Sequence, residues 1–264
     1  MIARIMRLHW ARLARRLARI ARPDLALPFI PGRQETLSGR EVWWIGHEGA
    51  LFDDLADEPV DTDQDAVQFL IDSVAAAPGQ IDVLAIGPLT NIATCLRQDS
   101  EFAHNVGRLI VMGGDFASHD RVAEHNFHCD AVAAQEVFAS SLPITAVGLD
   151  VTTQIALGQP EIDRIESAGP LGVALRAEIE QFWRFHGTAW NNPHDPVAAL
   201  TILRPELFEK QPRQIGIRGE GEQAGLAVTD QNSTSADVVT SLDRAAVVEE
   251  IVARILAAAS APAA

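Results

Sequence analysis

The sequence predicts an α/β fold with three layers, a Rossmann-like domain whose mostly parallel central sheet is flanked by helices. Three continuous apolar runs indicate buried parallel strands: Val83–Ile86, Leu109–Met112 and Ile144–Leu149. The first run is closed by Gly87-Pro88 and the second by Gly113-Gly114. Segments with helical spacing separate these runs, and this alternation of strand, loop and helix is typical of a parallel sheet covered by helices.

Composition limits the class of protein. The chain has 264 residues, of which 47% are hydrophobic and 22% charged, as in an ordinary globular protein. Because there is no internal repeat and no linker, we expect one domain over residues 1–264. No apolar stretch approaches the ~18 residues of a membrane-spanning helix, and the net charge of −15 argues against nucleic-acid binding. With only Cys95 and Cys129, a disulfide framework is excluded and a cytoplasmic location is expected.

The first element is predicted to be a basic amphipathic helix over residues 1–22. This segment holds seven arginines and no acidic residue. Its apolar side chains recur at three- and four-residue steps: Met6, Trp10, Leu13, Leu17 and Ile20. A surface helix whose apolar stripe packs on the sheet is favoured, and a transit peptide or a membrane-surface helix is the alternative.

The remaining elements follow from the same patterns. Residues 25–30 are strand-like, and residues 42–45 form another apolar run. We expect helices over 66–77, 90–97, 131–140, 171–185, 197–203 and 244–256, short strands with turns within 215–243, and a frayed tail over 257–264.

Four aspartates resemble the spacing of a calcium-binding loop: Asp61, Asp63, Asp65 and Asp72. The sixth position of that loop is Ala66, where the sharp turn requires glycine. The same aspartates are also typical of an acidic helix start, which the helix dipole favours. We therefore interpret them as the cap and first turn of the helix that follows.

A zinc site is a second alternative, because His119, His125, His128 and Cys129 carry suitable ligand atoms. Their spacing matches no common zinc pattern, so the zinc interpretation is disfavoured. The sequence also has no GxSxG elbow, no P-loop and no GxGxxG, which are the signatures of serine hydrolases, NTPases and dinucleotide-binding proteins.

Polar residues after the predicted strands are the candidate site, because ligands of parallel sheets bind at the carboxyl ends of strands. Glu124 and Asn126 are two residues apart, so on extended backbone they face the same side and could both hold a polyol. His194-Asp195 precedes a predicted helix, where the aspartate is either an N-cap or, with the histidine, part of an acid and metal site.

Five segments together resemble the inosine/uridine-preferring nucleoside hydrolases. Residues 84–93 (LAIGPLTNIA) are similar to the family's strand-loop-helix hallmark. The others are Val111-Met112-Gly113-Gly114, Ala123-Glu124-His125-Asn126 with Asp130, Gly148-Leu149-Asp150-Val151-Thr152, and His194-Asp195-Pro196. They occur in the family's order over most of the chain. The resemblance implies hydrolysis of the N-glycosidic bond of ribonucleosides in purine or pyrimidine salvage, with calcium as the cofactor.

The resemblance also implies roles for individual residues. Glu124 and Asn126 would bind ribose, while Asp195 and the backbone carbonyl of Ile86 would ligate calcium. His194 would be the catalytic acid that assists departure of the base, which suits a group that titrates near neutrality. Met112 would contact the substrate at a strand end. His47 would contact it near a His-Gly segment of the family, and Trp183, with His186, would line the base pocket or pack within a helix.

One family feature is absent from this sequence. The family begins with a strand that ends in a cluster of aspartates, which supplies the catalytic base and most calcium ligands, and the chain contains no such cluster. We therefore expect a chain that is truncated relative to the family, with weak calcium binding and inefficient hydrolysis. The alternative function is a catalytically silent relative that binds a ribosyl ligand or a partner protein. Exposed sheet or helix faces would favour a homo-oligomer.

Overall fold

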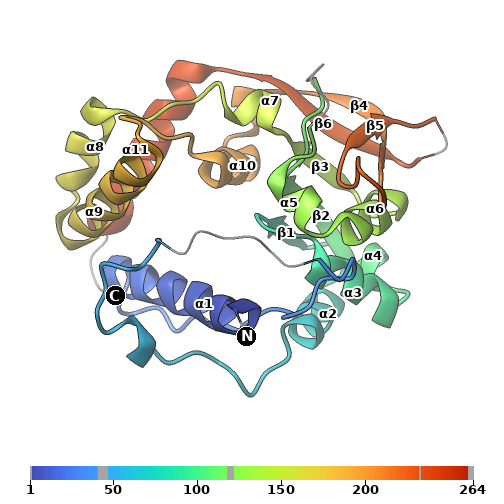
Figure 1. Cartoon of the computed structure of the whole chain (residues 1–264), viewed down its shortest axis with the longest axis horizontal. Helices are drawn as coiled ribbons and strands as arrows, with labels where there is room; N and C mark the ends of the chain where they lie inside the picture. Colours follow the sequence, from blue (N-terminus) through green and yellow to red (C-terminus); the bar gives the residue numbers. More distant parts are fainter. Residues whose placement is uncertain (1, 41–46, 118–121, 232, 261–264) are drawn as a thin grey trace.

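A six-stranded mixed sheet forms the centre of the protein (Figure 1). The computed structural model describes residues 2–40, 47–117, 122–231 and 233–260. The strands are β1 (Ile81–Ala85), β2 (Val106–Met112), β3 (Ile144–Val147), β4 (Phe208–Ile217), β5 (Ala227–Thr229) and β6 (Ser235–Leu242), in the order β1-β2-β3-β6-β4-β5. The first four strands in that order are parallel, whereas β4 pairs antiparallel with both β6 and β5. The mostly parallel sheet is therefore confirmed.

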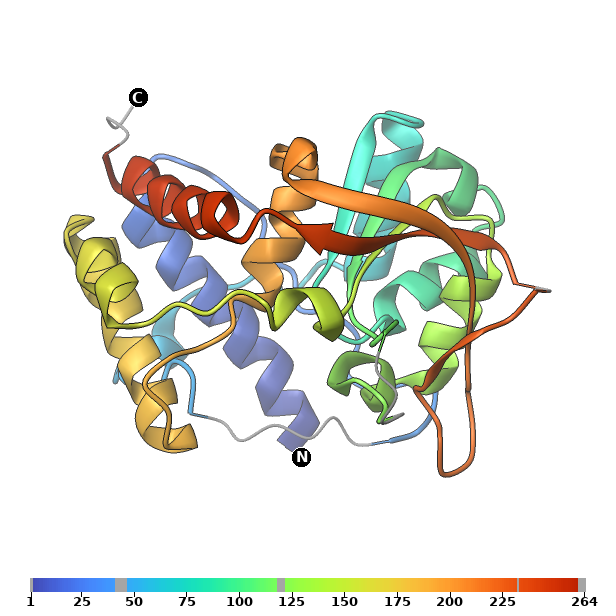
Figure 2. The ribbon, with the colours of Figure 1, turned by 90° about the horizontal axis from the view of Figure 1, so that it is seen from above.

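Helices flank this sheet at two sides. They are α1 (Ile2–Ala21), α2 (Ala66–Ala76), α3 (Thr90–Gln98), α4 (Phe102–Asn105), α5 (His125–Cys129), α6 (Ala131–Ala139), α7 (Leu149–Thr152), α8 (Gln159–Glu166), α9 (Gly169–His186), α10 (His194–Leu203) and α11 (Arg244–Ser260), with 3₁₀ turns η1 (Leu55–Asp57) and η2 (Pro205–Leu207). Figure 2 shows α8, α9 and α11 gathered at one side, and α2, α3 and α6 at the other.

The alternation of side chains along the strands builds a core on each face of the sheet. In β2, Leu109 and Val111 belong to the cluster that includes α3 and α6, whereas Ile110 and Met112 belong to the cluster with α8, α9 and α10. Successive residues of a strand point to opposite faces, so a continuous apolar run is what a doubly covered strand requires. This is why the three apolar runs were recognisable in the sequence.

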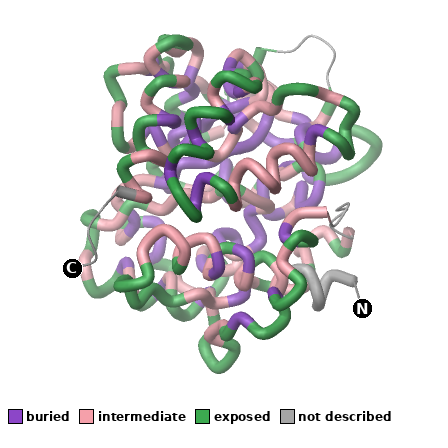
Figure 3. Tube along the Cα trace, turned by 90° about the vertical axis from the view of Figure 1, so that its left-hand side faces the viewer, coloured by how far each residue is buried: buried purple, intermediate pink, exposed green. Residues whose placement is uncertain are grey.

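The basic segment forms the predicted helix, but its place differs from the prediction. α1 packs against α9 and η1, and a cavity separates it from β1. Among its described side chains, only Leu13 and Arg16 are buried. In Figure 3 the half of the molecule that carries the N-terminus accordingly shows fewer buried segments. The stripe therefore does not pack on the sheet, because α9 already supplies an apolar partner.

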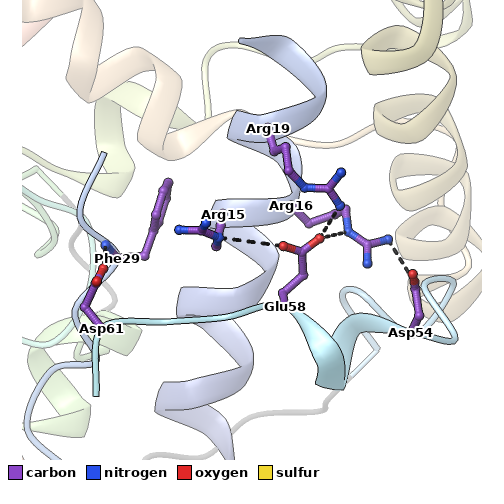
Figure 4. Close-up of polar contacts among 7 residues, drawn as sticks. All are labelled: Arg15, Arg16, Arg19, Phe29, Asp54, Glu58 and Asp61. Carbon is purple, nitrogen blue, oxygen red and sulfur yellow. Dashed lines mark hydrogen bonds and ion pairs between the residues drawn. The ribbon is translucent and has the colours of Figure 1, made fainter. Parts of the chain in front are cut away.

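An ion-pair network fixes residues 54–58 to α1 (Figure 4). Glu58 is 5% exposed and accepts hydrogen bonds from Arg16 and Arg19, with Arg15 at 3.8 Å. Arg16 also donates to Asp54 at 2.9 Å. Because these arginines are paired within the chain, the structure supports the interpretation of α1 as a helix of the domain.

Three predicted features need correction, and one lies outside the described residues. Residues 25–30 form no strand, because Phe29 instead exchanges hydrogen bonds with Asp61, whose carboxylate accepts from the Phe29 amide at 2.6 Å. The strand predicted over 144–149 ends at Val147, where Gly148 caps α7. Residues 257–260 continue α11 rather than fray, since alanine has the highest helix propensity. The run over 42–45 lies outside the described residues, as do 261–264.

Helix capping at Asp65 is confirmed. Its carboxylate accepts from the amides of Val67 and Gln68 at the start of α2. Within the described residues no helix is long and apolar enough to cross a membrane.

Candidate active site

The candidate site is a cavity of about 490 Å³ between the carboxyl ends of the parallel strands and the start of α10. Its lining brings together residues from four of the five motif segments: Ile86, Met112, Glu124, Asn126, His194 and Asp195. Parallel strands end at one edge of the sheet, so the loops after β1 and β2 meet there. The structure thus assembles six of the eight selected residues.

Glu124 is a buried carboxylate that organises the loop after β2. It is the N-cap of α5, where it accepts hydrogen bonds from the amides of Asn126 (2.8 Å), Phe127 (3.1 Å) and Gly114 (3.1 Å). Burial raises its pKa, an effect that the three amides oppose. A carboxylate has about four acceptor positions, so Glu124 keeps one for a ligand hydroxyl.

Asn126 is held in one orientation on the cavity wall. Its amide nitrogen donates to the backbone carbonyl of Met112 at 3.1 Å. Met112 therefore contributes through its carbonyl, which fixes the side chain of Asn126. The remaining oxygen of the Asn126 amide is an acceptor for a ligand.

His194 opens α10 and is oriented by a hydroxyl. Its Nδ1 shares a hydrogen bond of 2.7 Å with Oγ1 of Thr152 at the end of α7. This leaves Nε2 as the nitrogen available to a ligand. Burial lowers the pKa of His194, so the ring is neutral at pH 7. Thr152 belongs to the motif Gly148–Thr152, but its place in the sequence gives no indication that its hydroxyl orients His194.

Asp195 is a partly buried carboxylate without a hydrogen bond among the described residues. It is not the N-cap of α10, since Pro193 occupies that position and Asp195 lies in the first turn. Burial, together with the charge of Glu124, raises its pKa to about 6. A carboxylate in this setting favours a proton, a cation or a hydrogen-bond donor from a ligand.

An aliphatic wall faces this polar rim. It consists of Ile165 from α8, Leu175 and Ile179 from α9, and Ile251 and Ile255 from α11. The sequence shows that these residues are apolar, but it gives no indication that they share a cavity. The arrangement suits a ligand with one polar end and one flat apolar end.

Two of the selected residues lie elsewhere. His47 stacks on Phe185 of α9, with ring centroids 4.8 Å apart, and its ring also lies 5.8 Å from that of His186. Trp183 is buried in the core beside α8 and α10, and its indole donates to Asn191 at 3.3 Å. The side chains of His47, Trp183 and His186 do not line the described cavity.

The described residues do not fit a calcium ion. Calcium requires about six to eight oxygen ligands, whereas the acceptors identified on the rim are the Asp195 carboxylate, the Ile86 carbonyl, one position of Glu124 and the Asn126 amide oxygen. Among the described residues there is no group of three or more histidine, cysteine, aspartate or glutamate side chains that could hold a metal.

The zinc alternative gains no support from the structure. Nε2 of His125 lies 3.5 Å from the Cys129 sulfur, whereas His128 contacts the carbonyl of Ala224. His119 lies outside the described residues.

Comparison with known proteins places these features in one family. A family profile described as "Inosine-uridine preferring nucleoside hydrolase" matches residues 7–249. Uridine nucleosidase 1 of Arabidopsis thaliana is 33% identical over 222 residues, which cover 79% of this chain and 66% of that protein. A probable uridine nucleosidase 2 of Oryza sativa subsp. japonica is 32% identical over 217 residues, 77% of this chain and 64% of that protein. The chain thus spans slightly less than two thirds of the length of these curated relatives.

Solved structures agree with the fold. A plant nucleoside hydrolase, PpNRh1, has a TM-score of 0.74 at 22% identity, over 88% of this chain and 80% of that chain. A purine-preferring ribonucleoside hydrolase from Gardnerella vaginalis has a TM-score of 0.70 at 26% identity, over 76% of this chain and 68% of that chain.

Proposed function

Because the chain belongs to the inosine-uridine preferring nucleoside hydrolase family, we propose that it acts on the N-glycosidic bond of ribonucleosides, releasing ribose and a free base. The observation that carries this proposal is the pairing of His194 and Asp195 on one cavity rim with Glu124 and Asn126. Opposite them stands the aliphatic wall, which suits the flat face of a nucleobase.

The two buried free cysteines fit a reducing compartment, so we place the protein in the cytoplasm.

Glu124 and Asn126 hold the ribose. Each keeps an acceptor oxygen after its internal hydrogen bonds are made, and ribose hydroxyls are donors. Since backbone groups fix both side chains, these acceptors are oriented before the substrate arrives, and little conformational entropy is lost on binding.

His194 protonates the leaving base. As the bond from C1′ to the base nitrogen breaks, the bonding electrons remain on the base, which takes a proton from Nε2 of the imidazolium form of His194, and the ring returns to the neutral form in which it rests at pH 7. The hydrogen bond between Thr152 and Nδ1 orients the ring and leaves Nε2 as the nitrogen that meets the base. General acid catalysis of this kind contributes about 10²–10⁴-fold to the rate.

Asp195 stabilises the positive charge that develops at C1′ in an oxocarbenium-like transition state. A water molecule then adds to C1′ and gives up one proton, which completes ribose. Of the two carboxylates on the described rim, Asp195 is the one not engaged by backbone amides, so it is the group suited to accept that proton.

The test is release of ribose from uridine and from inosine by the purified 264-residue chain. Substituting His194→Ala or Asp195→Asn is expected to reduce kcat at least about 100-fold. His104→Ala and Asp53→Asn are matched controls on exposed positions outside the cavity and are expected to retain activity. Equal activity of His194→Ala and His104→Ala would contradict the assignment.

The rim offers fewer oxygen ligands than calcium requires, and this favours a second candidate function. The family resemblance implies calcium, but among the described residues no group of three or more histidine, cysteine, aspartate or glutamate side chains could hold a metal ion. A relative that binds a ribosyl ligand without turnover would retain the roles of Glu124 and Asn126. Calorimetry of ribose or inosine binding that detects binding, with no ribose released, would select this second function over hydrolysis.

A further inference from the structure

Two neighbouring asparagines precede α10 and line the candidate active site: Asn191 and Asn192. Neither belongs to the five motif segments of the sequence. Hydrogen bonds within the protein hold both side chains, so each amide has one fixed orientation. The two amides differ in the end that is occupied, and this difference decides what each can offer to a ligand.

Asn191 keeps a hydrogen-bond donor. Its Oδ1 accepts a hydrogen bond of 3.3 Å from the indole Nε1 of Trp183. An indole N–H only donates, so this bond fixes the amide with its oxygen toward Trp183. The backbone N–H and C=O of Asn191 both pair with Leu157, which lines the same cavity. Among the described residues, Nδ2 of Asn191 has no hydrogen-bond partner.

Asn192 keeps a hydrogen-bond acceptor. Its Nδ2 donates to the backbone carbonyls of Ile155, at 2.6 Å, and Thr153, at 3.3 Å. Carbonyl oxygens only accept, so the nitrogen of the amide is fixed toward them. Oδ1 of Asn192 has no partner within the part of the chain that the structure describes. Two adjacent residues therefore offer one donor and one acceptor.

These amides belong to the end of the cavity that the base would occupy. Asn191 is bonded to Trp183 of α9 and to Leu157 just before α8, and α8 and α9 both supply residues of the aliphatic wall. Glu124 and Asn126, the residues proposed to hold ribose, lie instead at the start of α5. The aliphatic wall can cover the faces of a base but cannot bond its polar edge, which needs groups such as these amides.

We propose that Asn191 and Asn192 recognise the hydrogen-bonding edge of the base, an inference that rests on the proposed action on ribonucleosides. Oδ1 of Asn192 accepts from an N–H of the base, and Nδ2 of Asn191 donates to the neighbouring acceptor. Uracil offers this pattern through N3–H and a ring carbonyl, and amino-substituted bases offer it through the amino group and a ring nitrogen. The ligand is thus a ribonucleoside whose base carries a donor next to an acceptor. A base without that pattern leaves a fixed amide unpaired, which weakens binding.

The experiment is calorimetry of ligand binding to the chain that carries His194→Ala, because slow turnover in this variant leaves the ligand intact. The ligands are ribose, uridine and 3-methyluridine, in which a methyl group replaces the N3 hydrogen. We expect uridine to bind more tightly than ribose. We expect 3-methyluridine to bind about 10-fold more weakly than uridine, because it has no hydrogen for Oδ1 of Asn192.

Further variants in that background locate the contact. Asn192→Ala lacks the acceptor and should bind uridine and 3-methyluridine within about 2-fold of each other. Asn191→Asp keeps an oxygen for the indole of Trp183 but loses the donor, so it should bind uridine about 10-fold more weakly while ribose binding is unchanged. Asn105→Ala, at the end of α4 and outside the cavity, is the matched control and should retain the preference for uridine.

Three outcomes would overturn the proposal: no uridine binding, equal binding of uridine and 3-methyluridine by the chain with His194→Ala, or a preference for uridine that persists in Asn192→Ala. Failure of the proposed function looks different. Ribose release from uridine by the unchanged chain, without a preference in binding, would contradict only the amide contacts. A preference for uridine that depends on Asn192, without ribose release, would support the contacts and contradict hydrolysis.

Discussion

At the scale of single residues, Asp195 shows how position in a fold changes a carboxyl group. Its pKa of about 6, raised by burial and by the charge of Glu124, lies above the ordinary aspartate value of 3.8. A raised carboxyl pKa means that the native state is favoured while the group is protonated. This contribution is fully present below pH 3.8 and is lost as pH rises through about 6.

We therefore predict that Asp195→Asn stabilises the chain at pH 8 while it abolishes activity. The unfolding free energy should rise by about 2–3 kcal/mol at pH 8, since a shift of one pKa unit corresponds to about 1.4 kcal/mol. The gain should vanish at pH 4. Urea unfolding with a chelator present measures this, and an asparagine variant that is less stable at pH 8 would contradict it.

Asp130 is the opposite kind of buried carboxylate. It is fully buried, and it accepts from the amides of Leu37, Ser38 and Ala133 and from the Thr90 hydroxyl. Every hydrogen bond is internal, so this residue of the family motif holds the loop at 37–38 against α3 and α6 rather than binding a ligand.

Loss of Asp130 is predicted to destabilise the fold. Asp130→Ala leaves four donors without their acceptor and should lower the unfolding free energy by about 2–4 kcal/mol. Asp72→Ala, which removes an exposed carboxylate on α2, should change it by less than about 0.5 kcal/mol. Denaturant titration compares the two, and equal effects would exclude an anchoring role.

At the scale of elements, α1 is attached to the protein by charge as well as by packing. Glu58 is enclosed by arginines of α1, and burial alone would raise its pKa. The hydrogen bonds from Arg19 and Arg16 outweigh burial, so its pKa is lowered. A lowered carboxyl pKa contributes stability above the unfolded value of 4.5, which is lost as pH falls through the folded value.

Glu58→Gln should therefore destabilise the chain at pH 7 by about 1–3 kcal/mol, and this difference should shrink as pH falls below 4.5. Asp57→Asn, one residue away on η1 and exposed, is the matched control and should have little effect. Thermal unfolding at pH 7 and at pH 3 provides the measurement. A difference that grows at low pH would refute the role of this ion-pair network.

At the scale of the whole molecule, one sheet separates two cores. Val238 and Val239 of β6 point into opposite cores, so neither core exists without the strands that they share. We therefore propose that the chain folds as one domain.

Core substitutions on the two faces test this cooperativity. Phe138→Ala in one core and Ile162→Ala in the other should each lower the free energy of unfolding by about 2–5 kcal/mol. Each variant should still unfold in a single transition. Circular dichroism and tryptophan fluorescence should report the same midpoint. Two resolved transitions, with each variant shifting only one, would show two independent units.

The sequence by itself determined the three parallel strands of the apolar runs, the longer helices and the family to which the chain belongs. Continuous apolar runs require strands covered on both faces, Asp65 requires a helix start, and five short motifs carry the resemblance. The motifs also indicated Glu124, Asn126, His194 and Asp195, because their residue types follow strand ends or begin helices.

Only the tertiary structure decided which distant residues meet. Packing between elements far apart in sequence decides that α1 lies against α9, that Trp183 lies in the core and that His47 lies beside Phe185. The same packing forms the aliphatic wall from three helices. Local periodicity shows that a helix face is apolar but not what covers it. The cavity between β1 and α1 likewise follows from sheet order, which a pattern along one chain does not contain.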